Sequence, residues 1–96
     1  MSIHFGKEKF HSGMLCLVEA GDIHSRVAAA LTQHLLHIKG SEDLPESVSN
    51  QFSSFCDSLG IEANGHVSEH LSKMSDLEVE HIAKNIVSLY EKLLTS

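Results

Sequence analysis

The sequence predicts an all-α fold, a small antiparallel helical bundle of about four main helices with a short accessory helix. Along most of the 96 residues, apolar side chains recur at spacings of three and four, which is the period of an amphipathic helix and not of a strand. Residues that begin or end helices stand between these apolar stretches, and the connections between them are short, as is typical of antiparallel neighbours. We therefore expect a single helical domain over residues 1–96.

The first apolar series begins at Lys7 and ends at Lys39, and it predicts two helices over residues 7–20 and 22–39. The helices meet at a glycine followed by Asp22, whose carboxylate can accept hydrogen bonds from the free amides of the next turn. Two alternatives remain open: one continuous kinked helix, or a short strand over residues 14–20. The apolar members of the series are Phe10, Met14, Leu17, Ala28, Leu31, Leu35 and Ile38.

The middle of the chain predicts a helix over residues 45–59. Lys39 and Gly40 suit the end of the preceding helix, because a cation opposes the negative end of the helix dipole and glycine adopts a left-handed cap. A short connector then leads to Pro45. Proline suits the first helical position, because an N–H at that position has no hydrogen-bond partner within the helix and its absence costs nothing. Gly60 suits a Schellman stop after the helix.

The last third of the chain predicts a turn over residues 63–65, a short helix over 66–74 and a long helix over 76–94. Ser75 and Glu78 have the spacing of a capping box, in which each side chain accepts a hydrogen bond from the other residue's amide. The apolar face of the long helix consists of Val79, Ile82, Ile86, Leu89, Tyr90 and Leu93.

Two phenylalanines are the expected centre of the core. Phe52 and Phe55 lie one turn apart on the apolar face of the predicted 45–59 helix, so the assembled bundle should bury both. The residues that we expect beside them are Leu31, Leu35, Ile82 and Ile86.

Composition argues against several classes of protein. Seven Lys and Arg residues against thirteen Asp and Glu residues give a formal charge of −6, which is the wrong sign for a nucleic-acid-binding surface. No apolar run approaches the ~20 residues of a membrane span, and no basic and then apolar signal segment opens the chain. Two cysteines are too few for a disulfide framework. We therefore expect a cytoplasmic protein that binds neither nucleic acid nor membrane.

Eight histidines are the main anomaly of composition, and they suggest an alternative function, a metal-binding helical bundle. His66 and His70 are spaced to share one face of a helix. Glu78 and His81 have the Glu-x-x-His spacing of carboxylate-bridged metal bundles, and the same spacing recurs near the N-terminus. Neither Glu-x-x-His pair falls on the centre of an apolar face, where a metal site in a bundle core needs its ligands. We therefore expect no metal cofactor.

His24 is the histidine that we expect to be buried, because it lies on the apolar stripe of the predicted 22–39 helix. Burial without a hydrogen-bond partner would lower its pKa, and the stability of the fold would then fall as the pH drops. Histidines on the surface would contribute no such pH dependence.

The sequence contains no recognisable catalytic constellation. Cys16 and Cys56 stand beside apolar residues, without the neighbouring cations that activate a thiol. Arg26 is the single arginine, whereas enzymes that bind anionic substrates usually hold them with arginine. A glycine-rich phosphate loop and a Cys-x-x-Cys motif are both absent. We therefore expect neither an enzyme nor a bound cofactor.

A role in protein–protein interaction is the leading functional hypothesis. The final helix has more apolar side chains than one packing seam requires, namely Leu77, Ala83, Val87, Tyr90 and Leu94. Such a face suits a surface shared with a second copy or another protein, but also a central helix that its own neighbours contact on two sides. We expect a homodimer or another protein partner. A third hypothesis is a bundle that encloses a small apolar ligand.

Overall fold

A computed structural model describes residues 3–59 and 67–95, and within these ranges the chain is helical and has no strand. The four long helices are α1 (Ile3–Leu17), α2 (Ile23–Gln33), α4 (Glu46–Leu59) and α6 (Asp76–Thr95). The short elements are the 3-10 helix η1 (Leu35–His37), α3 (Gly40–Asp43) and α5 (Val67–Ser72). The predicted all-α bundle is confirmed. Among the residues described, none of the helices combines the length and the apolar content that crossing a membrane requires.

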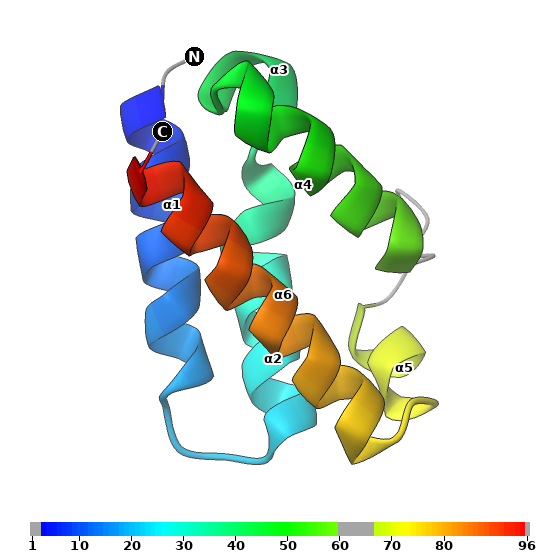
Figure 1. Ribbon diagram of the computed structural model, residues 1–96. Helices are drawn as coiled ribbons and strands as arrows, with labels where there is room; N and C mark the ends of the chain where they lie inside the picture. The colour runs from blue at the N-terminus through cyan, green and yellow to red at the C-terminus, as the bar shows by residue number, and fades with distance from the viewer. Residues whose placement is uncertain (1–2, 60–66, 96) are drawn as a thin grey trace.

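Helix α6 lies across the middle of the molecule and is contacted from several sides. It crosses in front of α2, with α1 along one side and α4 along the other (Figure 1). Helices α1 and α6 run in opposite directions, so the beginning of α1 and the end of α6 lie at the same end of the molecule (Figure 1). These three neighbours account for much of the width of the apolar face of α6.

The predicted break between the first two helices is correct, so the kinked-helix and strand alternatives are wrong. Gly21 has a φ of 121°, a conformation that favours glycine, and Asp22 accepts a hydrogen bond from the amide of Ser25 at 2.7 Å. Helix α1 ends at Leu17, earlier than expected, because its last carbonyl groups are bonded outside the helix. Nη1 of Arg26 donates to the carbonyl oxygen of Leu17 at 2.8 Å.

The predicted end of the second helix is wrong. Helix α2 ends at Gln33, and Gly40 begins α3 instead of capping a helix that runs to Lys39. The side chain of Asp43 is buried and accepts a hydrogen bond from the amide of Lys39 at 2.8 Å. This bond stabilises a new helical turn in what the sequence predicted as a connector.

Helix α4 agrees with the prediction to within one residue. Pro45 precedes the helix, and its carbonyl oxygen accepts hydrogen bonds from the amides of Val48 at 2.9 Å and Ser49 at 2.8 Å. The predicted stop at Gly60 and the turn over 63–65 lie outside the described residues.

The capping box at the start of α6 is confirmed. The amide of Ser75 donates to Oε1 of Glu78 at 3.0 Å, and the amide of Glu78 donates to Oγ of Ser75 at 3.2 Å. Helix α5 is shorter than the predicted 66–74 helix, since its described part ends at Ser72.

An aromatic cluster joins α1, α4 and α6 at the centre of the core. Phe52 and Phe55 are buried, as predicted. Phe10, which has no exposed surface, meets Phe52 edge-on at 5.8 Å between ring centroids and stacks on Tyr90 at 6.4 Å. The residues expected beside them, Leu31, Leu35, Ile82 and Ile86, are buried in the same hydrophobic core.

Candidate functional site

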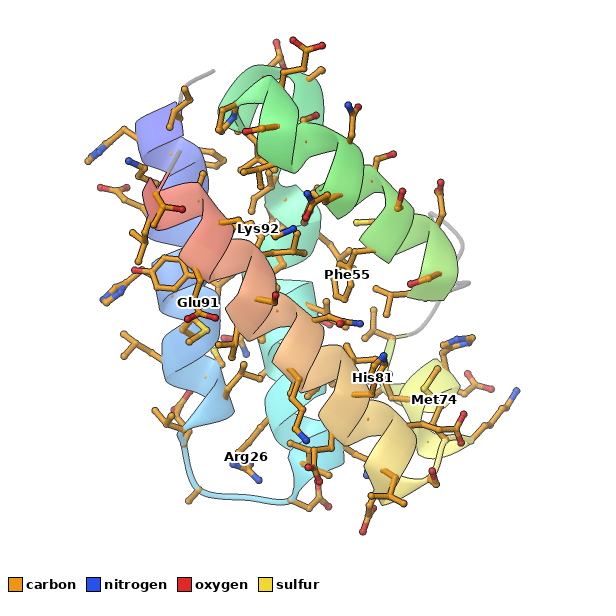
Figure 2. The ribbon with its side chains drawn as sticks, viewed as in Figure 1. Arg26, Phe55, Met74, His81, Glu91 and Lys92 are labelled. Carbon is orange, nitrogen blue, oxygen red and sulfur yellow. The ribbon has the colours of Figure 1, made fainter. Side chains whose placement is uncertain are left out.

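A groove of about 590 Å³ lies between the C-terminal half of α4 and the N-terminal half of α6. Phe55, Leu59 and Ile82 are buried core residues that also line it, so part of its lining is apolar. Figure 2 shows that Phe55 from α4 and His81 from α6 approach the same space between the two helices. The remaining lining residues are Ser58, Met74, Leu77, Glu78, His81 and Asn85.

The groove continues toward the other end of α6 as a second, more polar section of about 300 Å³. Phe55, Ser58 and Asn85 line both sections, so the two are continuous. Beyond the shared residues, Lys92 points toward α4 (Figure 2), and its Nζ donates to Oε1 of Gln51 at 2.6 Å. This bond links the two helices. The section near Leu77 is the larger and the more apolar of the two.

The structure separates the five residues of the predicted interface into two groups. Leu77 and Leu94 are exposed, by 77% and 54%, and lie near opposite ends of α6. Ala83, Val87 and Tyr90 are half-buried and pack against the core of their own chain. Some of the predicted interface residues therefore pack against their own chain, whereas Leu77 remains exposed at the groove.

The candidate metal ligands that the structure describes do not gather at one site. His66 lies outside the described residues, and His70 is half-buried on α5. Glu78 is held in the capping box, where the hydrogen bonds from Ser75 lower the pKa of its carboxyl group. His81 is exposed at the groove. Within residues 3–59 and 67–95, no three His, Cys, Asp or Glu side chains are placed to hold a metal ion together.

The second Glu-x-x-His pair, Glu8 and His11 of α1, does not share a partner. Glu8 pairs with His4 at 2.9 Å, and Nδ1 of His11 lies 3.3 Å from the hydroxyl oxygen of Tyr90. Tyr90 is in the C-terminal half of α6, whereas Glu78 and His81 are near its beginning. The two Glu-x-x-His pairs are therefore not brought together.

His24, which we expected to be buried without a hydrogen-bond partner, is described by the structure with partners. His24 is half-buried but has partners: its Nε2 donates to the carbonyl oxygen of Met74 at 2.9 Å, and its Nδ1 lies 3.5 Å from the carboxylate of Asp76. These contacts connect α2 to the segment that begins α6. Among the described residues, the buried side-chain nitrogen that makes no hydrogen bond is Nδ1 of His34.

Burial lowers the pKa of His34 below its usual value, because a charged imidazolium would lose its hydration. Lys9 and His37 act in the same direction, and Glu19 opposes them. His34 stands at the break between α2 and η1, which the sequence predicts as continuous helix. Its burial therefore follows from the actual path of the chain.

We expect His34 to make the fold less stable in mild acid. Its folded-state pKa lies below the unfolded value of about 6.5, so the unfolded chain binds more protons between these two values. The contribution to stability is complete above pH ~6.5 and is lost as the pH falls from there toward the folded-state pKa. Urea unfolding of wild-type protein and His34→Gln at several pH values measures this difference. The exposed His81→Gln variant is the control. If the free energy of unfolding of His34→Gln depended on pH as steeply as that of the wild type, His34 would not be the cause of the acid sensitivity.

Both cysteine thiols are in surroundings that disfavour the thiolate. Burial raises the pKa of Cys16, and a hydrogen bond with Glu19 adds to this effect. Burial also raises the pKa of Cys56, with a further contribution from Asp57. A nucleophilic cysteine needs the opposite shift.

The contribution of α4 to the groove is what sequence reasoning missed. Ser54 and Ser58 are typical of a solvated helix face, and no periodicity distinguishes them as lining a concave surface. The available signal was Leu77, an apolar residue outside the buried seam of its helix. Comparison with known proteins adds no further evidence, because no family model, curated protein or solved structure matches this chain.

Proposed function

We propose that the protein is a small helical interaction module that associates with a second copy of itself, and that the groove between α4 and α6 is part of the contact surface. The supporting observation is the position of Leu77. Its side chain is 77% exposed and stands at an open groove that contains Phe55, Leu59 and Ile82. Isolated exposed leucines are common on protein surfaces. An exposed leucine beside a partly apolar groove supplies both a projecting apolar side chain and a surface that can receive one.

The proposal includes no catalytic role, no metal and no nucleic-acid partner. The raised pKa values of Cys16 and Cys56 argue against thiol chemistry, and the net charge of −6 argues against binding to phosphate backbones. The low cysteine content suits the cytoplasm, where we place the module. Metal binding remains the alternative, and no group of ligands among the described residues favours it.

Sedimentation velocity over a wide concentration range tests the proposal. Wild-type protein is expected to form a dimer whose population rises with concentration, and Leu77→Asp is expected to remain monomeric under the same conditions. An aspartate in the first turn of α6 is compatible with the helix dipole, so this variant should fold, which circular dichroism verifies. Leu94→Asp is the matched control at the other end of α6 and should dimerise normally.

A wild-type protein that stays monomeric at every concentration would refute self-association. Loss of the dimer in Leu94→Asp but not in Leu77→Asp would instead place the contact near the C-terminal end of α6 and refute the role of the groove.

A further inference from the structure

We propose that His24 of α2 is a latch that holds the junction between α5 and α6 in place, and that this junction opens independently of the rest of the fold when the latch is released. The junction comprises residues 72–78. It includes Met74, Leu77 and Glu78, which line the groove between α4 and α6. The latch therefore determines whether this part of the groove wall is in position, whether or not a second copy binds there.

The junction has few contacts of its own with the hydrophobic core. Leu71 and Val79, the residues that flank it, have no exposed surface, whereas no side chain between them is buried. Met74 is half-buried and packs against the core, and the other residues of the junction are exposed. A segment with so little buried apolar surface opens at a lower free energy than the core helices do.

The backbone hydrogen bonds at the junction are local. Met74 lies where α5 leads into α6 (Figure 2), and its amide donates to the carbonyl oxygen of Leu71 at 2.9 Å. The amide of Val79 donates to the carbonyl oxygen of Ser75 at 3.1 Å. These bonds extend the end of α5 and the beginning of α6. They do not connect the junction to α2, and His24 provides that connection.

His24 contacts the junction from a helix that is distant in the sequence. Its Nε2 donates to the carbonyl oxygen of Met74 at 2.9 Å, and the two residues are 50 positions apart. The side chain of His24 is 25% exposed, so water competes only in part for this hydrogen bond. The contact of its Nδ1 with Asp76 at 3.5 Å adds little, because the side chain of Asp76 is 85% exposed. The hydrogen bond to Met74 is therefore the latch.

Helix α2 is a firm support for this latch. Val27, Ala30 and Leu31 have no exposed surface, and Asp22 caps the beginning of the helix just before His24. The helix packs against both α5 and α6. Breaking the latch therefore releases the junction and leaves α2 folded.

Amide hydrogen exchange on the full chain, followed by NMR at several urea concentrations, tests the independent opening. The amides of Glu78 and Val79 bond to Ser75 at the junction, whereas that of Phe52 lies inside α4. Relative to their rates in an unfolded chain, we expect Glu78 and Val79 to exchange faster than Phe52 and with a weaker dependence on urea. Such a difference indicates an opening that exposes only a short segment.

Removing the hydrogen-bond donor tests the latch itself. His24→Leu keeps an apolar side chain at this position but cannot donate to Met74. We expect the amides of Glu78 and Val79 to exchange about fivefold faster in this variant, which corresponds to the loss of one hydrogen bond of ordinary strength. His24→Gln is the rescue variant, because its side-chain amide can donate from nearly the same position. Its exchange should remain close to that of the wild type.

His37→Leu is the matched control. Nε2 of His37 also bonds to a backbone carbonyl oxygen, that of Thr32 at 3.1 Å, but near the other end of α2. This variant should leave the exchange of Glu78 and Val79 unchanged.

Three results would overturn the proposal. Equal protection and equal urea dependence at Val79 and Phe52 would mean that the junction opens only when the whole chain unfolds. Unchanged exchange in His24→Leu would mean that the bond to Met74 does not hold the junction. Fast exchange at the junction in His24→Gln or in His37→Leu would mean that the lost donor at His24 is not the cause.

Discussion

Replacing Phe10 with alanine is expected to lower the free energy of unfolding by about 4 kcal/mol, which is a large part of the stability of a domain of this size. Phe10 has no exposed surface, and its ring contacts Phe52 of α4 and Tyr90 of α6. The substitution removes buried apolar surface and leaves a cavity where three helices meet, and rigid helices can close such a cavity only in part.

Urea unfolding measures this effect directly, and Phe5→Ala is the matched control. Phe5 is on the same helix but only half-buried, with Nζ of Lys9 5.5 Å from its ring centroid. Its truncation should cost clearly less than that of Phe10. Equal losses for the two variants would show that Phe10 is not the centre of the contact between α1, α4 and α6.

Replacing Gly6 with alanine is expected to destabilise the protein by about 2 kcal/mol, although it places a better helix former inside α1. Helix propensity alone favours alanine by about 1 kcal/mol. Packing opposes it, because a Cβ at Gly6 would overlap the carbonyl oxygen of Asp43 and lie 2.9 Å from Cδ2 of Leu44. A backbone carbonyl cannot rotate away as a flexible side chain can, so α1 and α3 would have to separate.

Gly13→Ala is the control for this prediction, since it makes the same exchange in the same helix. The Cβ added there would lie 3.3 Å from side-chain carbons of Leu35, which can shift slightly. We expect its stability to remain within about 1 kcal/mol of the wild type, because the gain in propensity and the tight contact nearly cancel. Thermal unfolding of both variants compares the two sites. A Gly6→Ala protein that melts at or above the wild-type temperature would refute the close approach of α1 and α3.

The candidate site could be predicted only in part. Leu77 is recognisable in the sequence as an apolar residue outside the buried seam of its helix, and the structure leaves it exposed. The groove beside it was not predictable, because it depends on how α4 lies relative to α6. The local sequence of α4 does not indicate that arrangement. Ser58 has the same local character as Ser53, yet only Ser58 lines this groove.

The sequence by itself determined the features whose causes lie within one or two helical turns. Asp22 begins α2, Ser75 and Glu78 begin α6, and the apolar spacing in α4 predicts the burial of Phe52. Each of these depends on side chains that meet their partners through local helix geometry.

Only the tertiary structure decided where α2 ends and which of the described histidines has a buried nitrogen without a hydrogen bond. Apolar spacing continues past Gln33, but Gly6 lets α1 approach the carbonyl of Asp43, whose buried carboxylate holds the amide of Lys39 in a new helix. His34 stands at this change of path, half-buried and with its Nδ1 buried. Contacts between residues distant in the chain outweigh helix propensity here, because propensity is worth less than 1 kcal/mol for most residues whereas backbone overlap and buried polar groups cost more.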